Sequence, residues 1–449
     1  MDKLRGISTT ILEIVDNISI VAMIGIGSCA VIYFLFFQWL GYQEAMEFRR
    51  HLPALFSVIA FMYGVYRTVP VLEDFWGLTR TRINITHPIC VYIGIGLWVL
   101  FLNSLIIAFG YDPENIVPFH MILENFFGRY GNDTPHYISI AQRWYENSLC
   151  EHRLNIVFFP LYSIFIRVIY FVSPSYMFAA WAVSNFFAVA SGVMFYKLVL
   201  LLANEKEARL AVKFLYILPS AFFFIVPLTE SLFLFLSIGV IYYVLKGKHV
   251  HVFAFGLLAT LTRSAGALLF IPVACELLRG FNRKDIAKFA CLLAFPLGMG
   301  IYLLINFMVY GNATQFMVYQ YENWDQSLYF FWHTINYLMA HMFEYGRDWA
   351  VGLAGPGVIA FGLTLGIIVY GANKIRVSLT MFALGYFIFA FGPTWLLSGP
   401  RYAAVLFPLA LVGAKIASKK KGYNLVLTIA YLVLFALYFH EFVVDNFVF

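Results

Sequence analysis

Charge is scarce in this chain. Only 12% of its 449 residues are charged, whereas roughly a quarter of the residues are charged in soluble domains. Internal repeats and low-complexity linkers are missing as well, and no segment has the composition of a separate soluble domain. This scarcity excludes most classes of soluble protein and leaves an integral membrane protein.

Motifs for metals and nucleotides are also absent. The five cysteines show no CxxC spacing, the histidines form no HExxH, and no Walker or GxGxxG loop follows a credible strand. We therefore predict no structural or catalytic zinc and no soluble nucleotide binding. The net charge of +6 comes from small basic clusters beside apolar segments, which favours lipid headgroup contacts and membrane topology over nucleic-acid binding.

Apolar runs occupy almost the whole chain, of which 62% is hydrophobic. Roughly 20 helical residues cross a hydrocarbon core of about 30 Å, and runs of this kind recur throughout. We predict an all-α polytopic, multi-pass membrane protein with about 11–13 transmembrane or re-entrant helices, in which residues 18–40 are a retained first helix. The expected spans are 18–40, 52–72, 88–110, 176–201, 208–222, 230–246, 286–309, 350–370, 376–397, 401–417 and 424–444.

Two further apolar stretches, 156–172 and 250–278, decide the topology. If each crosses once, the basic groups near Lys206 and Lys246 fall outside; if the first is re-entrant and the second a broken hairpin, they fall inside. The positive-inside rule favours the second arrangement. External loops 111–155 and 310–349 then hold most polar groups, with interfacial helices at 115–127 and 328–343.

The segment GNDTPHYISIAQRWYENS, residues 131–148, gathers ionisable side chains directly after a hydrophobic span. A helix that starts at Thr134 or Pro135 would place Asp133 at its N-cap, since proline is tolerated at the first helical position. The same carboxylate could instead serve as a general base that projects from a fixed helix start into a cavity. Capping and catalysis are compatible, so both interpretations stay open.

Three arginines stand in apolar surroundings, where an unpaired charge costs on the order of several kcal/mol. Arg263 in LTRSAG and Arg401 in SGPRYAAVLFP could bind a phosphate through paired hydrogen bonds, or could simply reach the membrane interface. Arg167 lies in the middle of FFPLYSIFIRVIYF, which favours a re-entrant segment whose arginine reaches the cavity.

Two carboxylate-bearing motifs complete the candidates. Glu230 in PLTESLFLF begins a span, where the helix dipole favours a carboxylate and Thr229 could cap the turn; lining a pocket or pairing with arginine is the alternative. YENWDQ supplies Glu322 and Trp324, and a tryptophan beside carboxylates suits either stacking on a sugar ring or an interfacial position.

These motifs, in this order, resemble a known family. The series Asp133-x-x-His136-Tyr137 with Tyr145-Glu146, FFPLYSIFIR, TESLF, LTRSAG, NFMVYG with QFMVYQYENW, and RYAAVLFP is similar to the PIG-V-like mannosyltransferases, which belong to the GT-C class of membrane glycosyltransferases. The similarity covers about residues 88–440. The sequence departs from the family pattern at Gly131 and Asn132, where Arg-Trp is frequent, and at Trp144, where glycine is frequent.

The resemblance implies a GT-C-type catalytic domain at 76–449, with residues 1–75 as an additional N-terminal transmembrane helix pair. It implies transfer of a sugar, commonly mannose, from a polyprenyl-phosphate donor to a lipid-linked or surface glycan acceptor on the external or luminal face of the plasma membrane or endoplasmic reticulum. Asp133 would be the catalytic aspartate of an inverting reaction. The implied donor-phosphate or pocket residues are Arg263, Arg401, Arg167, His136, Tyr137, Glu230 and Tyr402, and the acceptor or sugar residues are Glu146, Glu322 and Trp324.

Arginines that neutralise the departing phosphate would make a metal cofactor dispensable, although a divalent cation stays an open alternative. Rival functions are a transporter or flippase for a lipid-linked sugar, a transferase for another group, and a noncatalytic scaffold subunit. Transporters often carry paired broken helices in two related halves, and no such symmetry is visible in the sequence.

Overall fold

The computed structural model describes residues 88–110, 117–130, 133–147, 151–279, 281–327, 329–341, 344, 349–393 and 398–443. Every extended regular element in these ranges is a helix, of the α, 3-10 or π type. The predicted all-α class is therefore confirmed. The predicted N-terminal helix pair, residues 1–75, lies outside the described residues, so the expected total of 11–13 helices stays a prediction.

The chain divides into two compact units, residues 1–126 and 127–449. The described part of the first unit holds α3 (Pro88–Gly110), followed by the beginning of α4 (Phe119–Tyr130). The second unit contains all the candidate site residues, and the remaining description concerns this unit alone.

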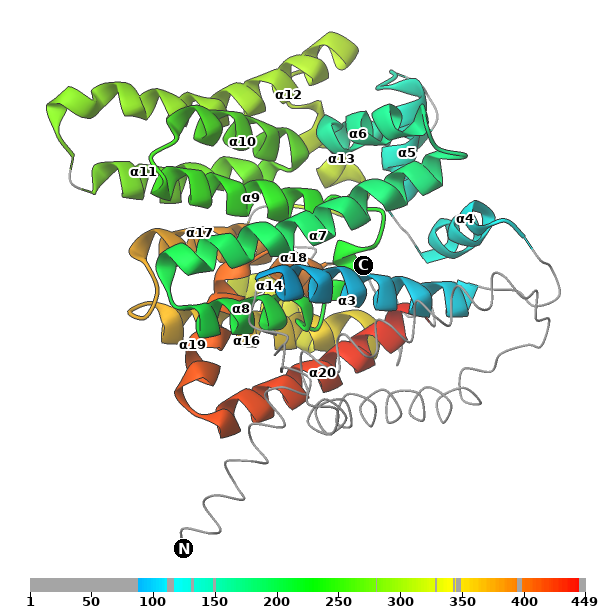
Figure 1. Cartoon of the computed structure of the whole chain (residues 1–449). Coiled ribbons are helices and arrows are strands. Elements are labelled where there is room, and N and C mark those ends of the chain that lie inside the picture. Colours follow the sequence, from blue (N-terminus) through cyan, green and yellow to red (C-terminus); the bar gives the residue numbers. More distant parts are fainter. Residues whose placement is uncertain are drawn as a thin grey trace, which may run out of the picture. The chain divides into compact units, whose positions relative to one another are not determined.

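Adjacent apolar helices form the core of the second unit. α7 (Tyr176–Leu202) packs against α9 (Glu230–Leu245), which also contacts α10 (His249–Thr262), and the three lie side by side (Figure 1). Two serine hydroxyl groups join α7 to α9 and to the loop that precedes α9. Ser191 Oγ donates to the Ser231 carbonyl at 3.1 Å, and Ser184 Oγ donates to the Leu228 carbonyl at 3.2 Å. Such hydrogen bonds support helix association where water is absent.

The other helices of this unit follow from local sequence signals. Ser175 caps α7 by accepting from the Phe178 N–H, Asn204 caps α8 by accepting from the Glu207 N–H, and prolines open α5, α6, α16, α18 and α19. These remaining helices are α5 (Thr134–Arg143), η1 (Glu151–Val157), α6 (Pro160–Tyr170), α8 (Glu205–Tyr216), η2 (Ala221–Phe224), η3 (Ser264–Leu269), α11 (Phe270–Leu278), η4 (Arg283–Leu293), α12 (Ala294–Tyr310), α13 (Gln315–Trp324), α14 (Phe331–Ala340), η5 (Ala350–Ala354), α16 (Gly355–Gly371), α17 (Val377–Phe391), α18 (Gly399–Ala404), α19 (Phe407–Lys419) and α20 (Lys421–Val443).

Five stretches of helix are long and apolar enough to cross a membrane. They correspond to five of the predicted spans and establish a polytopic membrane protein. Two other predicted spans, 230–246 and 376–397, form the shorter apolar helices α9 and α17. The five long ones are Pro88–Ile106, Tyr176–Leu202, Ile286–Tyr310, Gly352–Gly371 and Lys421–Phe442.

Two predicted spans are wrong as continuous helices. The expected span 208–222 is interrupted, because α8 ends at Tyr216 and a loop with Pro219 precedes η2. The expected span 401–417 is divided at Val405 and Leu406, which separate the six-residue α18 from α19. Pro408 starts the second piece, since proline cannot donate the backbone hydrogen bond that a continuous helix needs.

The two ambiguous stretches are both short or broken. α6 has 11 residues, about 16 Å of helix, which is too short to cross the hydrocarbon core. In 250–278 the chain leaves the helix at Arg263, which adopts an extended backbone between α10 and η3. Both observations agree with the expected re-entrant segment and broken hairpin. Helices also form inside the predicted interfacial segments, as α4 and α14.

Gly266 permits the reversal that follows Arg263. A Cβ at this position would meet the backbone carbonyl of Ala259 and lie 2.6 Å from the Thr260 nitrogen. Because these neighbours are backbone atoms of α10, they cannot move without displacing the helix. The close approach of η3 to α10 therefore requires glycine.

We expect Gly266→Ala to lower the free energy of unfolding by about 1–3 kcal/mol, as overpacking against rigid atoms does. Thermal unfolding of the detergent-solubilised protein measures this. Gly300→Ala on α12, where a Cβ meets nothing within 4 Å, is the matched control and should leave stability equal or slightly higher. Equal stability of the two variants would contradict the packing argument.

Candidate functional site

A polar cavity of about 410 Å3 lies where distant segments of the second unit meet. These segments are the start of α5, the connection between η1 and α6, the break at Arg263, α13 with the residues after it, and α18. The lining residues are Asp133, His136, Tyr137, Val157, Phe158, Phe159, Thr262, Arg263, Ser264, Phe316, Gln320, Trp324, Gln326, Ser398, Arg401 and Tyr402.

Glu230 anchors the charged groups of this cavity. It is fully buried at the first position of α9, and its Oε1 accepts hydrogen bonds from Arg263 Nη1 at 2.6 Å and Arg401 Nε at 2.5 Å. Its Oε2 is also buried and has no hydrogen-bond partner among the described residues. One carboxylate oxygen thus joins the broken hairpin to α18.

Arg401 extends this network to Asp133. Its Nη1 donates to Asp133 Oδ2 at 2.7 Å, and its side chain is only 5% exposed, whereas that of Asp133 is 32% exposed. Arg263 is 14% exposed, and its guanidinium lies 5.1 Å from the ring centroid of Tyr402. We call Asp133, Glu230, Arg263 and Arg401 the ion-pair network; Asp133 and Arg263 are the members that reach furthest into the cavity.

Asp133 occupies the N-cap position of α5, yet its side chain does not cap the helix. Its backbone carbonyl accepts from the His136 N–H at 3.1 Å, while its carboxylate turns to Arg401 instead of the first-turn amides. Capping by the carboxylate, one of the two interpretations of the sequence, is therefore wrong. The Asp133 side chain is free to face the cavity.

Hydrogen bonds on both sides hold the start of α5 in place. Thr134 Oγ1 donates to the Pro227 carbonyl at 3.0 Å, and Ser163 Oγ on α6 donates to the Tyr137 carbonyl at 2.9 Å. His136 Nδ1 lies 3.0 Å from Asn155 Oδ1, and its ring stacks on Phe158 with centroids 4.6 Å apart. The position of Asp133 is thus determined by neighbours that do not touch its carboxylate.

Electrostatics keep Arg401 charged and the nearby phenol of Tyr137 neutral. Burial alone would lower the pKa of Arg401, but the carboxylates of Glu230 and Asp133 raise it, and the pKa ends above its ordinary value. Burial raises the pKa of Tyr137 above its ordinary value, and the Asp133 carboxylate adds to this rise. Tyr137 therefore carries its proton at neutral pH and can only donate or accept a hydrogen bond.

Most residues predicted for the site line this cavity. His136, Tyr137 and Tyr402 face it beside the ion-pair network, and Trp324 faces it from the end of α13. Glu230 lies beneath it, buried behind the two arginines. The described structure thus brings together residues that are far apart in the sequence.

Three predicted site residues lie elsewhere. Arg167 is exposed near the far end of α6, eight residues or about 12 Å of helix beyond the cavity-lining Phe159. Glu322 is exposed because Phe316, Gln320 and Trp324 form the cavity face of α13 at four-residue spacing, which directs position 322 away. Glu146 is exposed too, and only its backbone carbonyl is bound, by the Tyr310 hydroxyl.

Other lining residues were not predicted. Phe316 and Gln320 lie eight and four residues before Trp324, on the same face of α13. This spacing could have predicted that they line the same cavity as Trp324. Ser264 and Ser398 each lie near a network arginine in sequence, but nothing in their local pattern distinguishes them from other serines. Phe158 enters the site by stacking on His136, which is a tertiary contact.

No group of three or more histidine, cysteine, aspartate or glutamate side chains is placed to hold a metal ion among the residues that the structure describes. Both network carboxylates hydrogen-bond to arginine. A phosphate, which arginine binds well, fits these donors better than a cation does.

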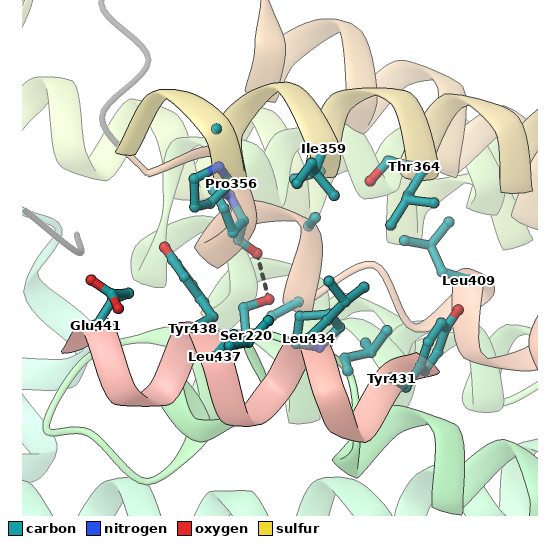
Figure 2. A pocket seen from close by; sticks show the side chains of 18 of the residues that line it. Ser220, Pro356, Ile359, Thr364, Leu409, Tyr431, Leu434, Leu437, Tyr438 and Glu441 are labelled. Atoms are coloured by element: carbon teal, nitrogen blue, oxygen red, sulfur yellow. Dashed lines mark hydrogen bonds between the residues drawn. The ribbon is translucent and has the colours of Figure 1, made fainter. Parts of the chain in front are cut away.

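A second, apolar cavity of about 330 Å3 lies next to α18. Figure 2 shows Tyr431, Leu434 and Tyr438 on α20 facing Pro356, Ile359 and Thr364 on α16. Pro400, Ala403 and Ala404 line this cavity, whereas Ser398, Arg401 and Tyr402 line the polar one. The two cavities therefore adjoin opposite faces of the short helix α18, whose Pro400 carbonyl accepts from Ser220 Oγ at 2.6 Å.

Comparisons of the chain with protein-family models, with curated proteins and with solved structures find no match. The resemblance to the PIG-V-like mannosyltransferases stays a prediction from the sequence motifs.

We expect Glu230→Gln to lower the free energy of unfolding by about 3–5 kcal/mol, because it leaves two largely buried guanidinium groups with a single carboxylate. Chemical unfolding in detergent measures the change. Glu205→Gln is the matched control: its pair with Arg209, 3.1 Å long, is exposed and should contribute less than about 1 kcal/mol. Similar losses for both variants would contradict the anchoring role of Glu230.

Proposed function

We propose that the chain is a membrane glycosyltransferase of the GT-C class that moves a sugar, with mannose as the first candidate, from a polyprenyl-phosphate donor to a lipid-linked or surface glycan. The observation that carries this proposal is the convergence of the Asp133 carboxylate with the Arg263 and Arg401 guanidinium groups in one polar cavity. A base and a phosphate-binding pair are the two parts that such a transfer needs.

The donor phosphate is best accommodated at Arg263. One of its nitrogens is bound to Glu230, and the part of the guanidinium that lines the cavity provides further donors in a rigid fork. Tyr402 lies against the same guanidinium and keeps it from turning away. Trp324 offers an aromatic face on which a sugar ring could lie.

In the proposed reaction an acceptor hydroxyl oxygen forms a bond to the anomeric carbon while the bond from that carbon to the phosphate oxygen breaks. The configuration at the carbon inverts. The hydroxyl proton moves to the Asp133 carboxylate, and the electron pair of the broken bond remains on the polyprenyl phosphate. Positioning and charge stabilisation supply most of the catalysis, because the phosphate is already a good leaving group.

The ion pair between Asp133 and Arg401 couples these two events. Before reaction, two guanidinium groups face two carboxylates, so the ion-pair network is formally neutral. Once Asp133 accepts the proton it no longer neutralises Arg401, and the network gains one positive charge as the phosphate gains one negative charge. Proton transfer thus strengthens the attraction for the leaving group when it is needed.

The apolar cavity on the other face of α18 suits the polyprenyl chain of the donor. Its lining is aliphatic and aromatic except for Ser220, Thr364 and Glu441, and an isoprenoid is an apolar chain that gains from contacts with such a surface (Figure 2). With the chain on one face of α18, the phosphate would lie near Arg401 on the other. The positive-inside rule favours the external or luminal side for the proposed reaction.

We expect Asp133→Asn to reduce sugar transfer by about 10²–10⁴-fold, the usual contribution of a general base. The assay incubates purified protein with radiolabelled polyprenyl-phosphate mannose and membrane lipid acceptors. Stability should fall less than in Glu230→Gln, since Asp133 is partly exposed.

Asp325→Asn serves as the matched control. Asp325 does not line the cavity, and asparagine tolerates its left-handed backbone, with φ of 45°. This variant should transfer sugar at the wild-type rate. Full activity of Asp133→Asn would refute the base assignment, and absence of transfer by the wild-type protein would favour the transporter or scaffold alternatives.

We expect Ala360→Phe, which fills part of the apolar cavity from α16, to raise the KM for a long-chain polyprenyl donor about tenfold while leaving kcat nearly unchanged. A donor with a short, water-soluble chain should be used equally well by both proteins. Ala430→Phe, on an exposed face of α20, is the control. Equal KM changes for long and short donors would contradict the placement of the chain.

A further inference from the structure

A third cavity, of about 460 Å3, lies far from the ion-pair network. Its charged lining comes from helix ends: Lys246 after α9, Arg279 after α11, Arg376 before α17, and Lys288 in η4. Glu276 is the one carboxylate among the lining side chains that the structure describes. Four cationic groups therefore converge on one acidic group.

The carboxylate of Glu276 is already hydrogen-bonded to neighbouring side chains. Glu276 accepts from Arg376 Nε at 2.9 Å and Nη2 at 2.7 Å, and its Oε1 also accepts from Ser378 Oγ at 2.5 Å. The Glu276 side chain is only 9% exposed, while that of Arg376 is 34% exposed. This fork occupies both oxygens of Glu276, so that the exposed Lys246 and Arg279 form no direct ion pair with a carboxylate among the described lining side chains.

Apart from His249, the rest of the lining is apolar or glycine, and includes Leu201, Val244, Leu245, Leu277 and Phe289. Cationic groups thus stand beside aliphatic surface at the ends of membrane helices, an arrangement that matches an amphiphile with an anionic head. A soluble anion has no apolar part that could contact these aliphatic side chains.

This cavity and the polar one mark opposite ends of the same helices. α9 starts at Glu230 and ends beside Lys246, so its 16 residues separate the two by about 24 Å. α10 runs the other way, from His249 at this cavity to Thr262 at the polar one. This distance approaches the hydrocarbon core of about 30 Å, which suits two cavities near opposite membrane faces.

We propose that this cavity binds a phosphate-bearing anion, and that the phosphate is the headgroup of an acidic phospholipid whose glycerol and first acyl carbons lie on the apolar wall. The site is independent of the sugar transfer proposed above. It would tie the ends of α9, α10, α11 and α17 to the leaflet that the positive-inside arrangement makes cytoplasmic.

The test uses the full chain in neutral detergent and the double variant Lys246→Gln/Arg279→Gln, which spares the Glu276–Arg376 pair. Native mass spectrometry measures binding of dioctanoyl phosphatidylglycerol, with dioctanoyl phosphatidylcholine as the uncharged-headgroup probe. We expect the double variant to bind phosphatidylglycerol at least about tenfold more weakly, given the contribution of each basic residue to headgroup attraction. Binding of phosphatidylcholine should be unchanged.

Lys419→Gln/Lys420→Gln removes two exposed cations outside the cavity and should bind phosphatidylglycerol as wild type does. Inorganic phosphate is the competing probe for a soluble source: displacement of the lipid at equal concentration would overturn the lipid assignment. Unchanged phosphatidylglycerol binding in the cavity variant, or an equal loss in the control, would overturn the site itself. Arg263→Gln, which alters only the other cavity, should not affect this binding.

Discussion

The buried carboxylate of Glu230 is the interaction on which the rest of the site depends. A single negative charge inside a membrane protein would be costly, and here it is stabilised by Arg263 and Arg401, which approach the same oxygen from two separate segments. This shared acceptor places the break of the hairpin beside α18. Asp133 then joins through Arg401, so one set of ion pairs links all four charged side chains.

The short helix α18 separates the polar cavity from the apolar one. One face of α18 presents Arg401 and Tyr402 to the polar cavity, and the opposite face presents Ala403 and Ala404 to the apolar cavity. In a continuous helix over residues 401–417, Arg401 would belong to a longer apolar helix instead of the short α18. The breaks at Arg263 and after α18 thus bring charged side chains into a fold built mainly of apolar helices.

Much of the architecture could be predicted from the sequence, because apolar runs of sufficient length, proline at helix starts and the polar break at Arg263 are local signals. The geometry of the site could not. Glu230 reads as an ordinary first-turn carboxylate, and only tertiary packing reveals that it is buried under two arginines. Arg167 was misplaced because a lone charge in an apolar stretch was expected to reach the cavity, whereas Leu161, Tyr162 and Ile166 belong to the buried face of α6 and Arg167 lies exposed.

The wide sequence separation of the ion-pair network has a consequence for biosynthesis. Glu230 and Arg263 lie 33 residues apart and can pair while the chain is still being made, whereas Asp133 and Arg401 lie 268 residues apart. The contact that completes the site therefore cannot form before Arg401 has been synthesised. Until α18 emerges, the nascent chain holds its catalytic candidate without a cationic partner, so the site stays incomplete until nearly the whole chain has been inserted.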